Sequence, residues 1–115
     1  MAESPDGVIL LAEVENKAVG LLHAWLRHTL DIPIFVPRRY VEIDNIAVRP
    51  DWRGRGIGRA LMEAAESWAR TRGAKSVELT VWEFNVGARA FYEELGYRTV
   101  NRRMARPLDA SNSKT

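Results

Sequence analysis

The chain has 115 residues, no cysteine, and 17 basic against 15 acidic side chains, for a net charge of +2. This length predicts one compact domain. The apolar share of 46% excludes a disordered chain, and the lack of cysteine excludes disulfides and thiolate metal sites. There is no apolar run long enough for a membrane span, no dense basic run for nucleic acid and no evident secretory signal. We therefore expect a cytoplasmic protein without a metal site.

The first half of the chain has the patterns of strands. Residues 8–14 are apolar and end at a polar turn, and residues 18–26 follow as the second half of a hairpin. The segment 29–37 contains two prolines, which favours a loop. Residues 40–48 are the third predicted strand.

The apolar period changes after the third strand. From Ile57 the apolar residues recur on one face of an amphipathic helix, and Gly73 is its expected end. Residues 76–82 are the fourth predicted strand.

A second helix is predicted to begin at Asn85, a good N-cap residue, and to end at Gly96. Residues 97–104 are the last predicted strand. The order β-β-β-α-β-α-β is that of an α/β domain with a mixed sheet. We expect a single domain over residues 1–108 and a flexible tail over 109–115.

A glycine-rich turn joins the third strand to the first helix. Gly54, Gly56 and Gly58 leave backbone N–H groups uncovered at the positive end of a helix dipole, where a pyrophosphate is well held. Neighbouring arginines that add positive charge are Arg53, Arg55 and Arg59. A tight turn that merely needs small residues is the alternative. The P-loop and dinucleotide-binding patterns do not match these glycines.

The pattern R-x-x-G-x-G at residues 53–58, behind a strand that ends at 45–48, resembles the GNAT superfamily of acetyl-CoA-dependent N-acetyltransferases. The segment 85–97 is similar to the last helix of that family, so the resemblance covers about residues 8–108. It implies a mixed, mostly antiparallel sheet flanked by helices. The strand and two helices with which the family usually begins have no counterpart here, so we expect an N-terminally shortened member.

The resemblance also implies how acetyl-CoA is held. In the family, the strand before the turn holds the pantetheine arm and the turn holds the pyrophosphate. The cofactor-binding residues implied in this way are Ile46, Ala47, Val48, Arg53, Gly54, Arg55, Gly56, Ile57, Gly58, Arg59, Asn85 and Tyr92. Tyr92 matches the position that protonates the departing thiolate, and a phenol is a suitable proton donor for it. The alternatives are that Asn85 is only an N-cap and that Tyr92 is a plain core residue.

An acceptor amine must lose a proton before it attacks the thioester, so a base is needed. Glu42 lies six residues before Val48, where the histone-acetylating branch of the family has its catalytic Glu, and it is our candidate. Thr80 stands where another branch has its Glu. Glu42 is favoured over His23 and His28, and the alternatives are a solvated strand face or an ordered water in place of a base.

We therefore expect an enzyme that transfers an acetyl group from acetyl-CoA to a primary amine. Direct attack in a ternary complex is expected, because no cysteine is present to carry an acyl group. A non-catalytic acyl-CoA-binding or regulatory module is one alternative, and an interaction domain that meets nucleic acid is another. The sequence does not distinguish a small-molecule amine from a peptide N-terminus or a lysine.

The N-terminal hairpin gives an expectation about assembly. If residues 8–14 form an open sheet edge next to the apolar residues 21–26, a symmetric partner is a simple cover for this surface. We expect a homodimer joined through the hairpin. The alternative is a monomer in which Pro5 and the 33–37 loop fold back over the edge.

Overall fold

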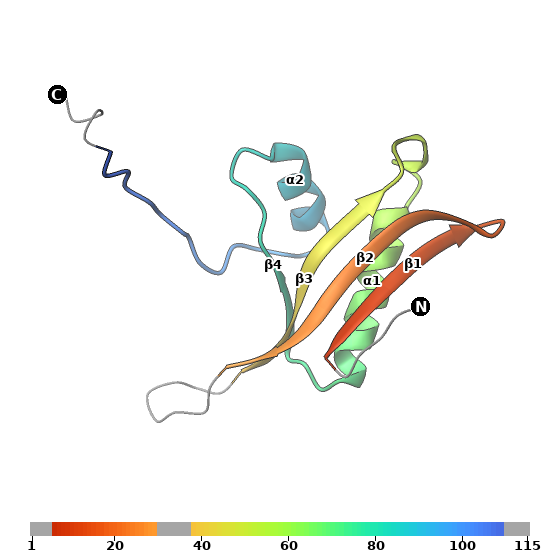
Figure 1. Ribbon diagram of the computed structural model, residues 1–115, viewed down its shortest axis with the longest axis horizontal. Coiled ribbons are helices and arrows are strands. Elements are labelled where there is room, and N and C mark those ends of the chain that lie inside the picture. Colours follow the sequence, from red (N-terminus) through yellow and green to blue (C-terminus); the bar gives the residue numbers. More distant parts are fainter. Residues whose placement is uncertain (1–5, 30–37, 110–115) are drawn as a thin grey trace. The chain divides into compact units, whose positions relative to one another are not determined.

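The computed structural model describes residues 6–29 and 38–109, and the chain divides into two compact units, Met1–Trp82 and Glu83–Thr115. The elements of the first unit are β1 (Gly7–Val14), β2 (Lys17–His28), β3 (Arg39–Val48), the short 3-10 helix η1 (Pro50–Trp52), α1 (Ile57–Thr71) and β4 (Ser76–Leu79) (Figure 1). The second unit contains α2 (Val86–Glu94). The predicted α/β class is confirmed.

One sheet with the order β1-β2-β3-β4 organises the first unit. β1 pairs antiparallel with β2, and β2 antiparallel with β3. β4 pairs parallel with β3, which requires a crossover connection, and α1 provides it. The turn between β1 and β2 places Glu15 and Asn16 at positive φ (52° and 66°), as a tight hairpin turn requires. The predicted mixed, mostly antiparallel sheet is therefore confirmed.

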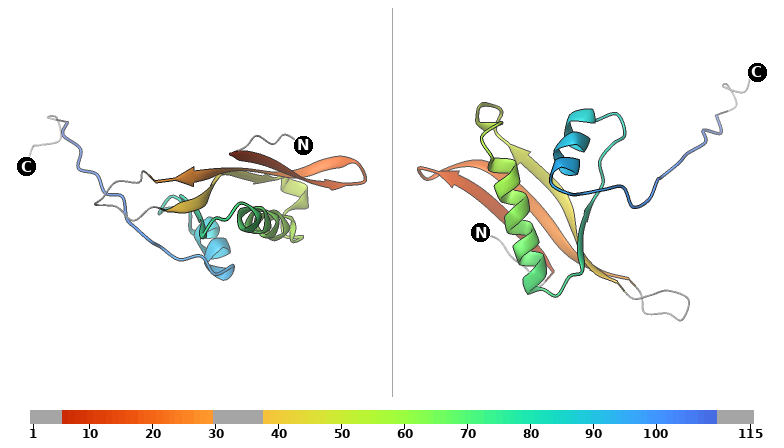
Figure 2. Two further views of the ribbon diagram at one scale, coloured as in Figure 1. Left: turned by 90° about the horizontal axis from the view of Figure 1, so that it is seen from below. Right: turned by 180° about the vertical axis from the view of Figure 1, so that it is seen from behind.

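Helix α1 lies along one face of this sheet (Figure 2). From Gly20 to Leu26 the residues of β2 alternate between the two faces, and those at even positions face α1: a Cβ added to Gly20 would lie 2.9 Å from Cγ2 of Ile57 and 3.1 Å from Cδ1 of Leu61. The core between the two layers consists of Val8, Val19, Leu22, Ala24, Leu26, Val41, Ile43, Leu61, Met62, Ala65 and Ala69. Within the described part of the first unit, no helix covers the opposite face.

The ends of α1 follow the sequence closely. The helix begins at Ile57, as predicted, directly after Gly56, and ends at Thr71 just before the positive φ of Gly73 (74°). The fourth strand is shorter than predicted: it stops at Leu79 instead of Trp82. Within the described residues, none of the helices is long and apolar enough to cross a membrane.

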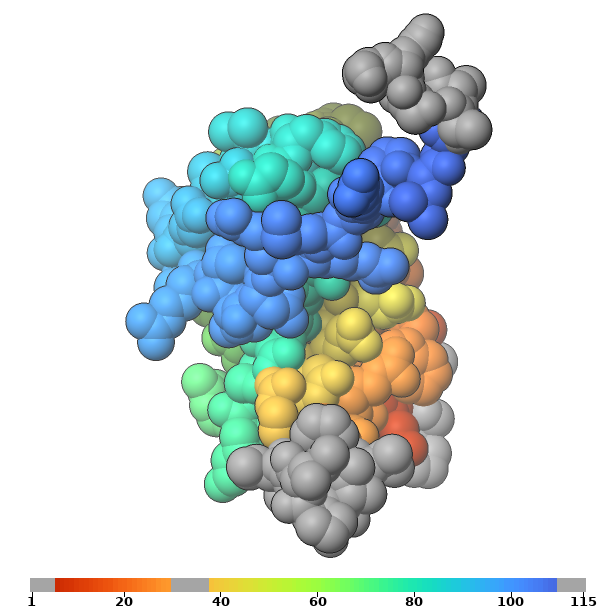
Figure 3. Space-filling view, turned by 90° about the vertical axis from the view of Figure 1, so that its left-hand side faces the viewer, coloured from red at the N-terminus to blue at the C-terminus, as the bar shows by residue number. Residues whose placement is uncertain are grey.

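In the described part of the second unit, α2 is the one regular element, and none of its residues is fully buried. Asn85 caps α2, and its Oδ1 accepts a hydrogen bond from the N–H of Ala88 at 3.1 Å. The predicted last strand at 97–104 is wrong, because these residues pair with no strand. Its apolar residues Val100 and Met104 are 75% and 82% exposed. Figure 3 shows this part of the chain, in blue, at the surface. A strand needs a ladder partner, and local sequence does not specify one.

Candidate functional site

The second half of β3 is an open strand edge in the first unit. β4 pairs with β3 only from Tyr40 to Ile43, whereas β2 pairs with β3 as far as Val48. Residues 44–48 therefore have a strand on one side and none on the other within the described part of this unit. The predicted pantetheine-binding residues Ile46, Ala47 and Val48 lie on this edge, where backbone N–H and C=O groups remain available to an extended ligand.

The chain turns sharply after the open edge. Nε of Arg53 donates a hydrogen bond to the carbonyl oxygen of Val48 at 3.2 Å, which ties the turn to the end of β3. Gly54 and Gly56 have φ of 76° and 84°, a conformation that favours glycine. A Cβ at either position would meet no atom within 4 Å. The space above both glycines is thus open to a ligand.

The turn leads into the N-terminus of α1. Gly56 is the N-cap, no side chain caps the helix, and its first turn has no acidic residue. The first N–H groups of a helix lack partners within the helix and carry partial positive charge, which favours an anion. The guanidinium of Arg55 lies over the ring of Trp52 at 4.7 Å, and the side chain of Arg59 is exposed. These residues fit a pyrophosphate, because backbone donors, open space and positive charge coincide here.

An apolar hollow of about 270 Å³ lies beside the open edge. It is lined by residues of β1 and β2 and of the end of β3, namely Leu11, Ala18, Val19, Gly20, Leu21, Ala47, Val48 and Arg49. Leu21 and Ala47 are direct partners in the pairing of β2 with β3. The hollow gives an apolar surface next to two of the predicted pantetheine-binding residues.

Tyr92 and Asn85 belong to the second unit. The ring of Tyr92 is half-buried and contacts Phe91 and Tyr97 edge-on, with centroid separations of 5.1 and 6.1 Å. Burial raises the pKa of the Tyr92 hydroxyl above its ordinary value of 10.0. The hydroxyl therefore holds its proton at neutral pH, which is the form that a proton donor needs.

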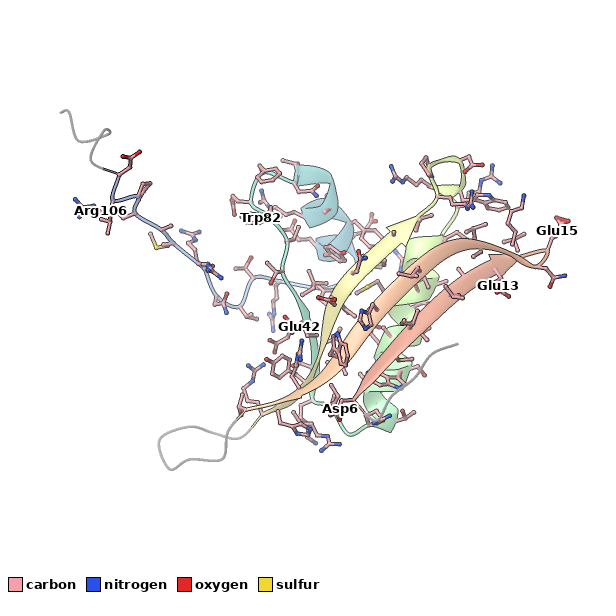
Figure 4. The ribbon with its side chains drawn as sticks, viewed as in Figure 1. Asp6, Glu13, Glu15, Glu42, Trp82 and Arg106 are labelled. Atoms are coloured by element: carbon pink, nitrogen blue, oxygen red, sulfur yellow. The ribbon has the colours of Figure 1, made fainter. Side chains whose placement is uncertain are left out.

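The carboxylates of Glu42 and Asp44 are both engaged on the sheet face opposite α1. Glu42 lies on β3 (Figure 4) and accepts a hydrogen bond from Nε of Arg27 at 2.9 Å. Oδ2 of Asp44 lies 3.4 Å from Nδ1 of His23. Each of the two carboxylates therefore has a cationic or titratable partner on this face.

The structure therefore brings together the residues of β3, the turn and the start of α1, all in the first unit. Two contacts there were not found from the sequence. The His23–Asp44 pair joins two strands, and no local pattern marks it. The stacking of Arg55 on Trp52 joins residues only three positions apart, and that spacing alone does not predict the contact.

Comparison with known proteins gives the family. Residues 1–97 match the model of the acetyltransferase (GNAT) family. An uncharacterized N-acetyltransferase of Methanocaldococcus jannaschii is 40% identical over 97 residues, which are 84% of this chain, and the chain spans 41% of that protein's length.

Two solved structures resemble this one. A mutant protein from Bacillus halodurans has a TM-score of 0.87 at 32% identity, with 92% of this chain and 68% of that chain covered. An aminoglycoside 6'-N-acetyltransferase, solved with a bisubstrate analogue that contains CoA, has a TM-score of 0.80 at 20% identity, with 90% of this chain and 70% of that chain covered, and it supports the fold alone. The open edge of β3, the glycine turn and these matches agree, and the chain belongs to the GNAT family of acetyltransferases.

Proposed function

We propose that the protein is an N-acetyltransferase that moves an acetyl group from acetyl-CoA to a primary amine in a ternary complex. The observation that carries the proposal is the continuity of the open β3 edge with the left-handed glycine turn and the uncapped N-terminus of α1. An extended arm that ends in a pyrophosphate matches this surface in both shape and charge. CoA has that form.

The binding roles follow from this placement. The backbone of Ile46, Ala47 and Val48 would hold the pantetheine arm, and the backbone of residues 53–59 the pyrophosphate. The side chains of the arginines in that turn add charge. Asn85 and Tyr92, which the family resemblance assigns to the cofactor arm, are proposed to contact it as well, and the capping role of Asn85 is compatible with such a contact.

The chemistry is an acyl transfer without a covalent enzyme intermediate. The neutral amine attacks the thioester carbon, a C–N bond forms, and the C–S bond breaks with its electron pair on sulfur. We assign the polarisation of the thioester carbonyl to a backbone N–H near Val48. Tyr92 gives its proton to the departing sulfur. Glu42 is the base that the sequence predicts, and its carboxylate accepts a hydrogen bond from Arg27.

Substitution of Gly56 tests CoA binding. Gly56→Glu places a negative charge and bulk in the open space above the turn, and CoA affinity measured by calorimetry should fall at least about 100-fold, because like-charge contact costs several kcal/mol. Gly56→Gln has the same backbone strain and similar bulk without the charge, and its loss should be smaller.

Gly73→Glu is the control for strain, because Gly73 also has a positive φ (74°) and lies just after the opposite end of α1. This variant should bind CoA as the unmodified protein does. Unchanged CoA affinity in a folded Gly56→Glu variant would remove the central claim.

An amine panel tests catalysis. The panel contains an aminoglycoside, a peptide with a free N-terminal alanine and a peptide with an internal lysine, and the readout is release of the CoA thiol. Turnover of any member supports an acetyltransferase. Tight acetyl-CoA binding without turnover on the panel would favour the alternative, a non-catalytic acyl-CoA-binding or regulatory module.

We also propose a cytoplasmic location and a homodimer. The cysteine-free sequence suits a reducing compartment. The position of β1 at the edge of the described sheet supports the dimer. The alternative cover, by Pro5 and residues 33–37, lies outside the described residues.

A further inference from the structure

A histidine and an aspartate meet on the sheet face that α1 does not cover. Nδ1 of His23 lies 3.4 Å from Oδ2 of Asp44, and their side chains are 28% and 58% exposed. His23 faces away from α1, since its neighbours Leu22 and Ala24 are both fully buried. The pair is thus open to a small molecule that approaches this face of the first unit.

An irregularity in the sheet brings the two side chains together. His23 pairs with Asn45 and Ala24 pairs with Ile43, so Asp44 is an extra residue in β3. Such a bulge redirects a side chain, and bulges are frequent beside active sites. Here the bulge brings the carboxylate of Asp44 close to the imidazole of His23 on the neighbouring strand.

The pair lies on the same sheet face as the apolar hollow beside the proposed pantetheine-binding residues. Leu21 and Ala47 are paired across the two strands and line the apolar hollow. His23 is the next residue of β2 on the same face, about 7 Å further along the strand at the usual rise per residue. His23 does not line the hollow itself, so the acceptor amine would bind over β2, between the hollow and the imidazole.

Asp44 lies at Nδ1 of His23, so Nε2 is the ring nitrogen that we consider as a base. Opposite it lie Ile9 on β1 and Asn45 on β3, with Asp44 at Nδ1. Along β2, the ring of Trp25 is 4.9 Å away by centroids, and beyond it Arg27 is paired with Glu42. The orientation of one ring nitrogen by a carboxylate is a common way to prepare the other as a base.

We propose that His23 is the base that deprotonates the acceptor ammonium and that Asp44 is a positioning residue for its ring. This inference rests on the proposed N-acetyltransferase function. Nε2 takes one proton from the ammonium, and the freed lone pair forms the C–N bond while the C–S bond breaks. Once the C–N bond has formed, the nitrogen loses its second proton to solvent, and solvent reprotonates the Tyr92 phenolate that remains after proton transfer to sulfur. The imidazolium returns its proton to solvent, so one proton is released in each turnover.

The test compares matched variants of the full chain with acetyl-CoA and the panel amine that the unmodified protein acetylates fastest. Thiol release is measured between about pH 5 and pH 9, the range in which imidazole changes charge. The rate of the unmodified protein should fall on the acid side, because a protonated imidazole accepts no proton. His23→Gln should lower kcat by about 100- to 1000-fold and abolish this acid limb.

Further variants separate a base from a structural residue. Asp44→Asn keeps the imidazole, so it should lower kcat by a smaller factor than His23→Gln and should keep the acid limb that His23→Gln loses. His28→Gln is the matched control at the far end of β2 and should behave as the unmodified protein. CoA affinity should be unchanged in all three variants.

The outcomes distinguish this proposal from the proposed function. If the unmodified protein acetylates an amine and His23→Gln keeps both the rate and the acid limb, the assignment of His23 is wrong and the acetyltransferase stands. Loss of both in Glu42→Gln alone would give the role to Glu42. If no amine is acetylated by the unmodified protein, the proposed function and the role of His23 are both overturned.

Discussion

Tyr92 shows how one residue serves both packing and chemistry. Its ring lies between Phe91 and Tyr97 in edge-on contacts, as a core residue would, and the N–H of Tyr97 donates to its carbonyl oxygen at 3.0 Å. The burial that packs the ring also raises the pKa of the hydroxyl. The packing role and the proton-donor role predicted from the sequence are therefore compatible.

The kinetic prediction for Tyr92 separates these roles. Tyr92→Phe keeps the ring and removes the proton, so kcat should fall about 10- to 1000-fold, in the range of a lost general acid. CoA affinity should change little, because the ring contacts remain. Steady-state kinetics with the best panel amine measure both quantities. An unchanged kcat would make Tyr92 structural and leave the proton to water or to the acceptor.

The raised pKa of Tyr92 also predicts how stability depends on pH. Because the folded chain holds this proton more tightly than the unfolded chain, the stabilisation is fully present below the ordinary pKa of 10.0 and is lost as pH rises through the higher folded pKa. Denaturant unfolding followed across this alkaline range should show a decline in the free energy of unfolding. The decline should be smaller in Tyr92→Phe, which cannot ionise there. An identical decline in both proteins would contradict the prediction.

At the scale of elements, the structure confirms those predicted from several agreeing signals. α1 has an apolar stripe, a glycine turn before it and Gly73 after it, and its predicted start and end were correct. α2 has its predicted cap at Asn85. The segment 97–104 lacks the period-2 alternation of a strand, since its apolar residues Tyr97, Val100 and Met104 stand three and four positions apart. Pairing also depends on a partner strand that local sequence does not specify.

The candidate site contains one part that a local motif describes and another that depends on strand register. Residues 53–59 are adjacent in the chain, and their chemistry comes from backbone conformation, so a short motif describes them. The pair His23–Asp44 depends on the register of β2 with β3 and on a bulge within it. A shift by one residue would move a side chain to the other face, and no local pattern records such a shift.

The contact of β2 with α1 gives a prediction for Gly20. In Gly20→Ala the new Cβ would lie 2.9 Å from Cγ2 of Ile57, the first residue of α1, and 3.4 Å from the carbonyl oxygen of Ala47. The free energy of unfolding should fall by about 1–3 kcal/mol through overpacking. CoA affinity should fall too, because Ile57 belongs to the proposed pyrophosphate turn.

A double-mutant cycle checks the cause of this loss. Ile57→Ala removes the clashing methyl group, so the effect of Gly20→Ala should be clearly smaller in that background. Denaturant unfolding of the four proteins gives the coupling energy. Equal effects of Gly20→Ala in both backgrounds would show that the clash with Ile57 is not the cause.

At the scale of the molecule, the sheet of the first unit has one covered face and one edge open to pairing. β1 is an edge strand of the described sheet, and its residues from Gly7 to Ala12 carry no charge. The acidic residues Asp6, Glu13 and Glu15 lie toward its two ends (Figure 4). Charges, prolines and bulges are the usual protection of an edge strand, and the middle of β1 has none of its own.

This edge predicts a symmetric dimer in which two β1 strands pair antiparallel and continue the sheet. Light scattering at tens of micromolar should therefore give twice the mass of the chain. Leu11, which is 44% exposed, lies in the uncharged stretch, so Leu11→Lys brings like charges together across the two-fold axis and should yield a monomer. Val100→Lys is the control, because Val100 is 75% exposed and lies in the second unit, and this variant should remain dimeric. If the unmodified protein is a stable monomer that does not aggregate, no second copy covers the edge, and the proposed dimer is wrong.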